Sequence, residues 1–487
     1  MRKPLLALLL GSASMVSSPL AAQMAMPTDF DTTACTADVA NWFPGGISAN
    51  GWVDPPSSVT FTDDNSNGGS GPNICNFYQW GAQMFLWLSS PAEDGLVLDS
   101  TGIYNVLPAV NGQRQLQNAG SAPLLNVALR GGKVDEIGEL EQAGGGVLMS
   151  QKKSLVYYGV HVNDLYADFL TGQKAGKIAG DPTQFPRNGN DLDAVMDYVA
   201  GNLPNEPVAP ETLAIELKTS WVDASTVSDV SKFITMPAIV PDYTADSTNT
   251  TWTLSGTKQI TLALVGMHVV GTVQDHPEFV WATFENIYNA PDVGYYYTNT
   301  QGDAVEFPFD SSGEYLFTPT GAADTGGNVQ CMTTGKNGSI VANMSGSNPA
   351  CTGGIVPSST LRVRPWGSNP TNDSAVVTNN TRLLSINASV RGQLASGDVR
   401  SNYVQAGGIW TTTPSTGGDA PVPNQTGNQS AQMRGSLGLY NATMETYSQT
   451  FADNCFFCHA DSQGAENSFG AFQLSHIYSQ IQPLPTK

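Results

Sequence analysis

The most constraining feature of the sequence is the stretch Asn-Cys-Phe-Phe-Cys-His-Ala at residues 454–460, near the end of a chain of 487 residues. It holds two of the six cysteines and one of the five histidines of the whole chain. Cysteine and histidine side chains at short fixed spacing usually share one disulfide, metal or cofactor. The last segment is therefore expected to be organised around a site that uses Cys455, Cys458 and His459.

The pattern Cys-x-x-Cys-His is the attachment pattern of c-type haem. Two thiols separated by two residues reach the two vinyl groups on one edge of the porphyrin, and the next histidine presents a nitrogen to the iron. We therefore expect Cys455 and Cys458 to hold one haem covalently and His459 to be its proximal ligand.

Three other interpretations of these residues explain less. A thioredoxin-like redox pair requires a strand followed by a helix that starts at the motif. A zinc site requires two further ligands, and the sequence has no second Cys-x-x-Cys and no His-x-x-x-His motif. A plain disulfide between Cys455 and Cys458 leaves His459 without a role.

The sequence leaves the sixth iron ligand open. No methionine follows Cys458, whereas His476 follows 17 residues after His459. His476 is either the distal ligand or a histidine at the surface or haem edge. The alternatives are Met433 or Met444 from the preceding segment, or a ligand or open position supplied by the rest of the chain.

A second cluster lies in the stretch 265–279, which contains His268, Asp275, His276 and Glu278. These residues could ligate a metal or face the haem, and His268 is the first candidate for a haem-facing residue from outside the last segment. A histidine in an apolar strand is, however, also typical of a hydrogen-bonded core residue. Asp275 and His276 before a proline also have the composition of a helix N-terminus.

The first 22 residues have the layout of a secretory signal peptide. Two basic residues precede an apolar run, and small residues surround Ala22, after which we expect cleavage. The run is too short to span a bilayer, and no later run reaches about 18 apolar residues. An N-terminal anchor is the alternative. We predict a mature chain that is exported, periplasmic or secreted, and not inserted in the membrane.

The other four cysteines fit two disulfides in an oxidising compartment. Three pairings are possible, and we favour the local pairs Cys35–Cys75 and Cys331–Cys351, because each would connect one loop-rich segment. Four free thiols are the alternative.

The charge balance disfavours nucleic acid as a partner. The chain has 21 Lys and Arg against 42 Asp and Glu, and removal of the signal peptide leaves a net charge of about −23, which is 19 minus 42. Such a polyanion is repelled by phosphate backbones and anionic lipid surfaces. The expected partners are a redox protein or a small electron donor or acceptor.

The expected fold class is α+β, with a large β-containing body at 23–410, a linker or long loop at 411–430, and a small α-helical, cytochrome c-like haem segment at 431–487 that packs on the body. Within the body, helices are expected at 76–90, 190–204 and 276–292, a strand and then a helix over 154–172, and strands at 213–221 and 257–273. The region 293–380 is rich in Gly, Thr and Asn, and short strands are expected in it. In the haem segment, helices are expected at 435–449 and 467–482. Glu216 and Lys218 are expected to share a solvated face of a strand.

On the motif Cys455 to His459 and the signal peptide, the chain resembles secreted bacterial mono-haem c-type cytochromes. The stretches at 281–292, 216–221 and 444–449 also look similar to large bacterial cytochrome-like proteins of poorly defined function. The resemblance implies a covalent haem and electron transfer. The chain departs from small cytochromes c because it has no downstream methionine and because more than 400 residues precede the motif.

Two function classes follow. The first is an exported electron-transfer cytochrome. The second is a haem-dependent oxidoreductase, either a peroxidase or oxygenase with an open iron or a dehydrogenase that drains electrons through the haem. A third hypothesis is a binding protein in which the haem serves as a sensor or a structural element. The sequence has no phosphate-binding loop, no Gly-x-Ser-x-Gly motif and no His-Glu-x-x-His motif.

Overall fold

The computed structural model describes residues 24–43, 75–92, 95–121, 125–126, 145–273, 276–309, 315–318, 328–343, 351, 353–411, 433–449, 454–461 and 471–487. The expected signal peptide lies outside the described residues, and so does the expected linker apart from Thr411.

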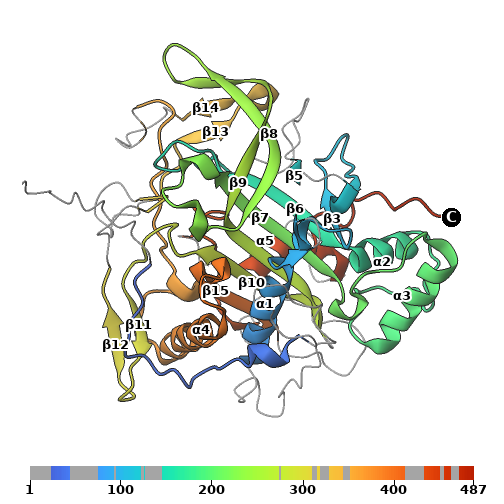
Figure 1. Ribbon diagram of the computed structural model, residues 1–487, viewed down its shortest axis with the longest axis horizontal. Coiled ribbons are helices and arrows are strands. Elements are labelled where there is room, and N and C mark those ends of the chain that lie inside the picture. The colour runs from blue at the N-terminus through green and yellow to red at the C-terminus, as the bar shows by residue number, and fades with distance from the viewer. Residues whose placement is uncertain are drawn as a thin grey trace, which may run out of the picture.

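A large, mainly antiparallel sheet dominates the fold (Figure 1). In the described part of the chain it has twelve strands, and eight of them follow the order β16-β15-β10-β9-β7-β6-β3-β4. The other four strands branch from β9: β8 and β14 pair with β9, and β5 and β13 pair with β8 and β14, respectively. The long ribbon of β8 and β9 projects from the molecule. The strands are β3 (Ile103–Val106), β4 (Leu116–Asn118), β5 (Leu125–Asn126), β6 (Tyr157–Asn163), β7 (Ile215–Asp223), β8 (Thr235–Ala245), β9 (Thr251–Val273), β10 (His276–Asn286), β13 (Met332–Thr334), β14 (Ile340–Ala342), β15 (Tyr403–Thr411) and β16 (Met433–Gly435).

Two short hairpins stand apart from this sheet. They pair β1 (Pro91–Ala92) with β2 (Gly95–Leu96), and β11 (Tyr295–Thr298) with β12 (Ala304–Phe307).

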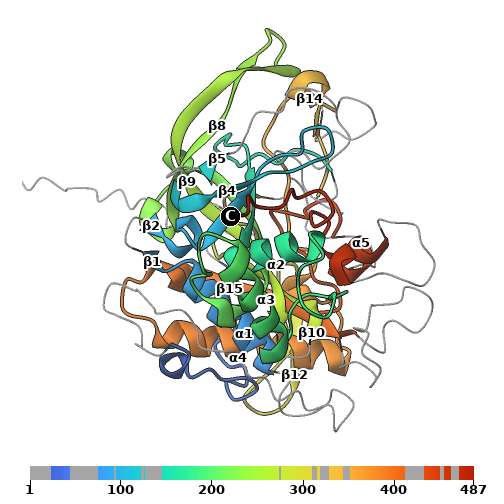
Figure 2. The same ribbon diagram turned by 90° about the vertical axis from the view of Figure 1, so that its right-hand side faces the viewer.

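Helices cover both faces of the sheet. The helices α1 (Cys75–Leu88) and α4 (Ser374–Gln393) pack on each other and on β15, and Phe85 of α1 stacks on Phe284 of β10. The opposite face carries α2 (Asp164–Lys174), α3 (Gly189–Asn202) and the short α5 (Cys455–Asp461), which Figure 2 shows beside the sheet. The coarse α+β class is therefore confirmed.

Most of the long elements of the body lie where the sequence predicts them. The helix α1 matches the expectation at 76–90, α3 matches 190–204, and β6 followed by α2 matches the strand and helix over 154–172. The strands β7 and β9 match the period-2 stretches, with bounds that shift by a few residues. Strong periodicity was a sufficient signal in these segments.

The predicted helix at 276–292 is wrong, because its first part is the strand β10. This strand lies inside the sheet between β9 and β15. Its two faces are also covered, one by α1 through Phe85 on Phe284 and the other by the last segment through Phe456 on Trp281, so its apolar residues do not alternate with polar ones. A bulge between His276 and Val280 contains Phe279 at a φ of 72°. The aromatic and β-branched content of Phe279–Phe284 was the signal for a strand.

The sequence analysis did not predict the helix α4. Its buried positions include Asn379 and Asn387, whose amides donate to the carbonyls of Trp366 and Gln405 at 2.9 Å. Polar residues on the buried side remove the apolar periodicity that identifies a helix.

The last segment is less helical than expected, and it is part of the main sheet rather than an independent bundle. Residues 436–449 form consecutive turns instead of a helix. Residues 471–487 contain a 3-10 turn, η14 (Ala471–Leu474), and then a stretch whose backbone pairs with Arg114 through Gln480 and Gln482. The segment also contributes β16 to the sheet, and it packs on the body as expected.

Both favoured disulfides, Cys35–Cys75 and Cys331–Cys351, are present. The helices in the described residues include none that is both long and apolar enough to cross a membrane.

Candidate functional site

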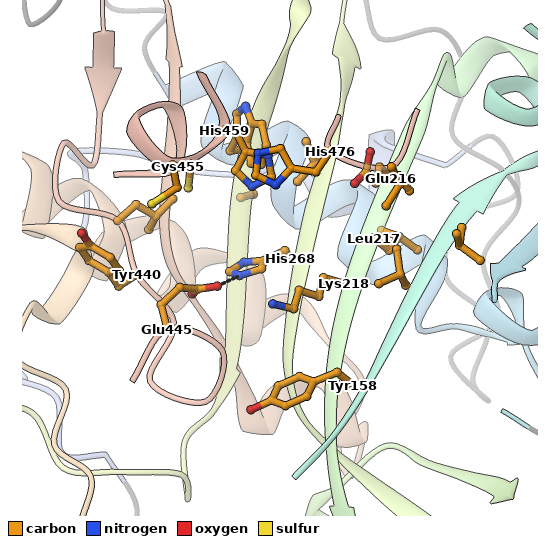
Figure 3. Close-up of a pocket in the computed structure, with 18 of the residues that line it drawn as sticks. Tyr158, Glu216, Leu217, Lys218, His268, Tyr440, Glu445, Cys455, His459 and His476 are labelled. Atoms are coloured by element: carbon orange, nitrogen blue, oxygen red, sulfur yellow. Dashed lines mark hydrogen bonds and ion pairs between the residues drawn. The ribbon is translucent and has the colours of Figure 1, made fainter. Parts of the chain in front are cut away.

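A cavity of about 280 Å³ lies between the sheet and the last segment of the chain (Figure 3). The sheet supplies one wall from β6, β7, β9 and β10, and the turns at 439–445, the helix α5 and residues 476–477 supply the other. Apolar residues make up much of the lining: Val106, Val160, Leu217, Val270, Trp281, Ala282, Leu439 and Ile477. Its polar and sulfur-bearing residues are Arg114, Tyr158, Glu216, Lys218, His268, Tyr440, Glu445, Asn454, Cys455, Cys458, His459 and His476.

Strand register explains why the sheet side chains meet in this cavity. Lys218 on β7 pairs directly with His268 on β9, and one pleat further along Glu216 pairs with Val270. Residues two apart on a strand face the same side, and paired residues on neighbouring strands do as well. The sheet therefore presents a short row of ionisable side chains to the cavity.

The helix α5 carries the Cys-x-x-Cys-His motif at the other wall. Asn454 caps it, because its Oδ1 accepts a hydrogen bond from the backbone N–H of Phe456 at 3.1 Å. Cys455 and Cys458 are not joined by a disulfide, and Cys458 is the more exposed of the two. Burial, with the nearby charge of Glu445, raises the pKa of the Cys455 thiol well above its usual range.

His459 is oriented by a backbone carbonyl. Its Nδ1 lies 2.7 Å from the carbonyl oxygen of Leu474. A carbonyl only accepts, so Nδ1 carries the proton and Nε2 keeps its lone pair. The edge of Trp281 packs on the ring with centroids 4.3 Å apart. Burial and the neighbouring His476 lower the pKa of His459 well below its usual range, which keeps the imidazole neutral.

His476 lies flat against His459, with ring centroids 4.0 Å apart and planes 15° apart. Burial lowers its pKa, while hydrogen bonds with the backbone of His459 and Cys458 act in the opposite direction. Both histidines therefore stand on the same side of the cavity (Figure 3).

His268 projects from the sheet wall, and Figure 3 shows its ion pair with Glu445. Its Nε2 lies 3.0 Å from Oε1 of Glu445, and the other carboxylate oxygen accepts from the backbone N–H of Asn441 at 2.9 Å. Burial tends to raise the pKa of Glu445, but His268, Lys218 and the Asn441 hydrogen bond together lower it. The carboxylate is therefore ionised, and it fixes the orientation of the imidazole.

Glu216 and Lys218 share a face of β7 as predicted, but this face is the cavity wall and not a solvated surface. The ammonium of Lys218 lies over the ring of Tyr158, 5.4 Å from its centroid, and burial lowers the pKa of Lys218. Glu216 accepts a hydrogen bond from Ser475 at 2.6 Å, and burial raises its pKa to about 7.

The turns at 439–449 hold Glu445 in place through hydrogen bonds to the sheet. Asn441 donates to Oγ1 of Thr283 at 2.8 Å and to the carbonyl of Phe284 at 3.1 Å, and its Oδ1 accepts from the backbone of Thr443. The local bond between Asn441 and Thr443 competes with helix formation, and the long-range bonds to the sheet hold the turns, which explains the failure of the predicted helix here.

The structure thus gathers five of the sequence candidates, Cys455, Cys458, His459, His476 and His268, around one cavity. Met444 is fully buried in a different apolar cluster, and Met433 contacts Asn454. Asp275 lies outside the described residues, as do the side chains of His276 and Glu278.

Sequence reasoning missed Glu445 and Trp281 as parts of the site. Glu445 lies between Met444 and Thr446 in a stretch that was expected to be a helix. Trp281 was assigned to a helix. In the structure it pairs with Val270 on β9 and shares its face of the sheet.

No protein-family model, no curated protein and no solved structure matches this chain. Among the described residues, no group of three or more His, Cys, Asp and Glu side chains is arranged to hold a metal ion by itself.

Proposed function

We propose that this chain is an exported c-type haem protein that carries one covalently attached haem and transfers electrons. Cys455 and Cys458 would form the two thioether bonds, and His459 would be the proximal iron ligand. The expected partner is a redox protein or a small electron donor or acceptor in the periplasm or outside the cell.

The observation that carries this proposal is the hydrogen bond from His459 to the carbonyl of Leu474. Metal-ligating histidines almost always donate their second ring N–H to a carbonyl, carboxylate or water, which fixes the tautomer and the ring orientation. His459 has this arrangement directly after two thiols that are not paired in a disulfide.

The surroundings also fit the group. The cavity of about 280 Å³, just below the range of about 300–1,000 Å³ that is typical of small-molecule sites, leaves space beside both thiols and His459. Trp281 packs on the ring of His459 and lines the cavity beside it.

Haem would supply one-electron chemistry, and the protein would tune it. The residues of this chain have three tasks in that scheme. Leu474 and Trp281 would orient His459, the apolar part of the lining would keep water from the group, and the charged residues of the cavity wall would set the electrostatic potential.

A haem-dependent oxidoreductase is the second candidate. The pair of His268 and Glu445 favours it, because a hydrogen-bonded imidazole and carboxylate at a haem cavity are suited to acid–base chemistry. An electron carrier does not require such a pair.

The decisive experiment is expression with a cytochrome c maturation system, followed by haem staining of a denaturing gel. The wild-type band should stain, and the double variant Cys455→Ser with Cys458→Ser should not. The matched control is Cys331→Ser with Cys351→Ser, which removes two cysteines elsewhere and should keep the stain. Equal staining of the 455/458 variant and the wild type would reject the proposal.

Export is tested separately. N-terminal sequencing of the mature protein should begin at Gln23 if cleavage follows Ala22. A mature chain that still begins at Met1 would contradict export through this signal.

A further inference from the structure

The arrangement of the cavity histidines leaves the wall opposite His459 available for a second molecule. His476 stacks in parallel with His459, so its ring nitrogens lie in a plane beside the His459 ring and do not point toward that ring. An iron between two axial imidazoles requires nitrogens that face one another. In this geometry His476 supports His459 from the side.

His268 is also arranged as a hydrogen-bonding group and not as a ligand. The Nε2 of His268 is engaged with Glu445 at 3.0 Å. Because the Glu445 carboxylate is ionised and only accepts, Nε2 carries the proton. In the neutral form of the ring the lone pair is on Nδ1, which has no hydrogen-bond partner among the described residues. In that form Nδ1 can accept a proton.

The neighbours of His268 strengthen this role. Glu445 is fixed by the backbone of Asn441, so it stabilises an imidazolium without moving. Lys218, the direct strand neighbour of His268, brings a cation to the same wall. Glu445 is thus placed to stabilise a proton on His268, and Lys218 is placed to attract an anion.

We propose that His268 is the proton acceptor for a small weak acid, HL, that enters this cavity. The H–L bond breaks, the proton goes to Nδ1 of His268, Glu445 stabilises the resulting imidazolium, and the anion L⁻ stays in the cavity, where the ammonium of Lys218 attracts it. No electron is transferred in this step. Hydrogen cyanide, hydrazoic acid and hydrogen peroxide belong to this chemical class. The inference rests on the proposed covalent haem.

The test uses the haem-loaded full chain and two probes. Cyanide binding to the oxidised protein is followed by absorption in stopped flow, and carbon monoxide binding to the reduced protein is the control, because carbon monoxide has no proton to lose. In His268→Gln, which keeps a hydrogen-bonding side chain but not a base, cyanide association should slow by about 100-fold. The rate for carbon monoxide should stay within about twofold of wild type, a bound that follows from the absence of a proton-transfer step.

A second variant protects the test against a folding failure. Glu445→Gln keeps the acceptor oxygen but removes the charge that stabilises the imidazolium, and it should slow cyanide association by about 10-fold, one step of 1.4 kcal/mol. Equal cyanide rates in the wild type and both variants overturn the inference. The inference is also overturned if the wild type binds neither probe, because the sixth coordination position of the iron would then be filled. This holds whether or not His268→Gln binds both probes. Loss of covalent haem from the wild type would instead reject the proposed function.

Discussion

His459 and His476 lie face to face, with ring centroids 4.0 Å apart and planes 15° apart, although the sequence presents them as candidates for opposite sides of one iron. The stack explains why a second histidine follows the motif at this distance. His476 and Trp281 together enclose the imidazole, and the carbonyl of Leu474 sets its tautomer.

The first prediction concerns His476→Ala. Because the stack places its nitrogens beside His459, the variant should keep the spin state and the axial-ligand bands of the wild-type absorption spectrum. The free energy of unfolding should fall by about 1 kcal/mol, the usual contribution of an aromatic pair. The measurements are oxidised and reduced spectra and urea denaturation. A change from a low-spin to a high-spin spectrum would make His476 the sixth ligand and contradict the prediction.

The site was only partly readable from the sequence, for a physical reason. The motif at Cys455–His459 is local, so its chemistry is visible in five consecutive positions. His268 was found as a histidine in an apolar strand. Glu445 was not found, because its role depends on turns that are stabilised by long-range hydrogen bonds such as that of Asn441 with Thr283.

The fold shows the same division. The helix α1 and the strand β9 were predicted because each has a strong local pattern. The strand β10 was misread because α1 covers one of its faces at Phe284 and the last segment covers the other at Trp281, which removes the alternation of apolar and polar residues. The helix α4 was missed because its buried Asn379 and Asn387 are paired by partners far away in the chain.

The second prediction concerns the disulfides. Cross-linking removes loop-closure entropy from the unfolded chain, and the loss grows with the sequence separation. The separations are 40 residues for Cys35–Cys75 and 20 for Cys331–Cys351. Paired alanine substitutions should therefore lower the free energy of unfolding by about 4 and about 3 kcal/mol, respectively. Denaturant titration with and without reductant measures both. A reductant that has no effect on the wild type would contradict the prediction.

The third prediction concerns the buried ion pair of Arg362 and Glu285. Both side chains are at most 2% exposed, and Nη2 of Arg362 lies 2.6 Å from Oε2 of Glu285. Arg362→Met leaves that carboxylate buried without its partner, which should cost about 3–5 kcal/mol. Glu285 also accepts from the backbone of Ala442, so the turns beside the cavity should loosen and haem retention should fall.

The control for Arg362 is Lys258→Met. Lys258 pairs with Asp242 at 3.4 Å, but both side chains are about half exposed at 44% and 45%. Exposed pairs contribute about 0–1 kcal/mol, so this variant should unfold at nearly the wild-type denaturant concentration. Similar losses of unfolding free energy in Arg362→Met and Lys258→Met would contradict the prediction that the buried pair is the costlier one to break.

The fourth prediction concerns pH and Asp168 on α2. Burial, and then the nearby charge of Asp164, raise the pKa of Asp168 from 3.8 to about 8. The folded state therefore binds this proton more tightly than the unfolded state, and the stabilisation is complete below pH 3.8. It is lost progressively as the pH rises toward about 8. Stability attributable to this group thus falls with rising pH, which is opposite to the behaviour of an ion-paired carboxylate.

Asp168→Asn removes that pH dependence, because an amide stays neutral throughout. Between pH 5 and pH 8 the wild type should lose about 2 kcal/mol more than the variant, since each pKa unit corresponds to 1.36 kcal/mol and local opening reduces the full effect. Urea denaturation at a series of pH values measures the difference, and the comparison at pH 5 is the internal control for the substitution itself. Parallel curves for the two proteins would mean that Asp168 titrates normally in the folded chain.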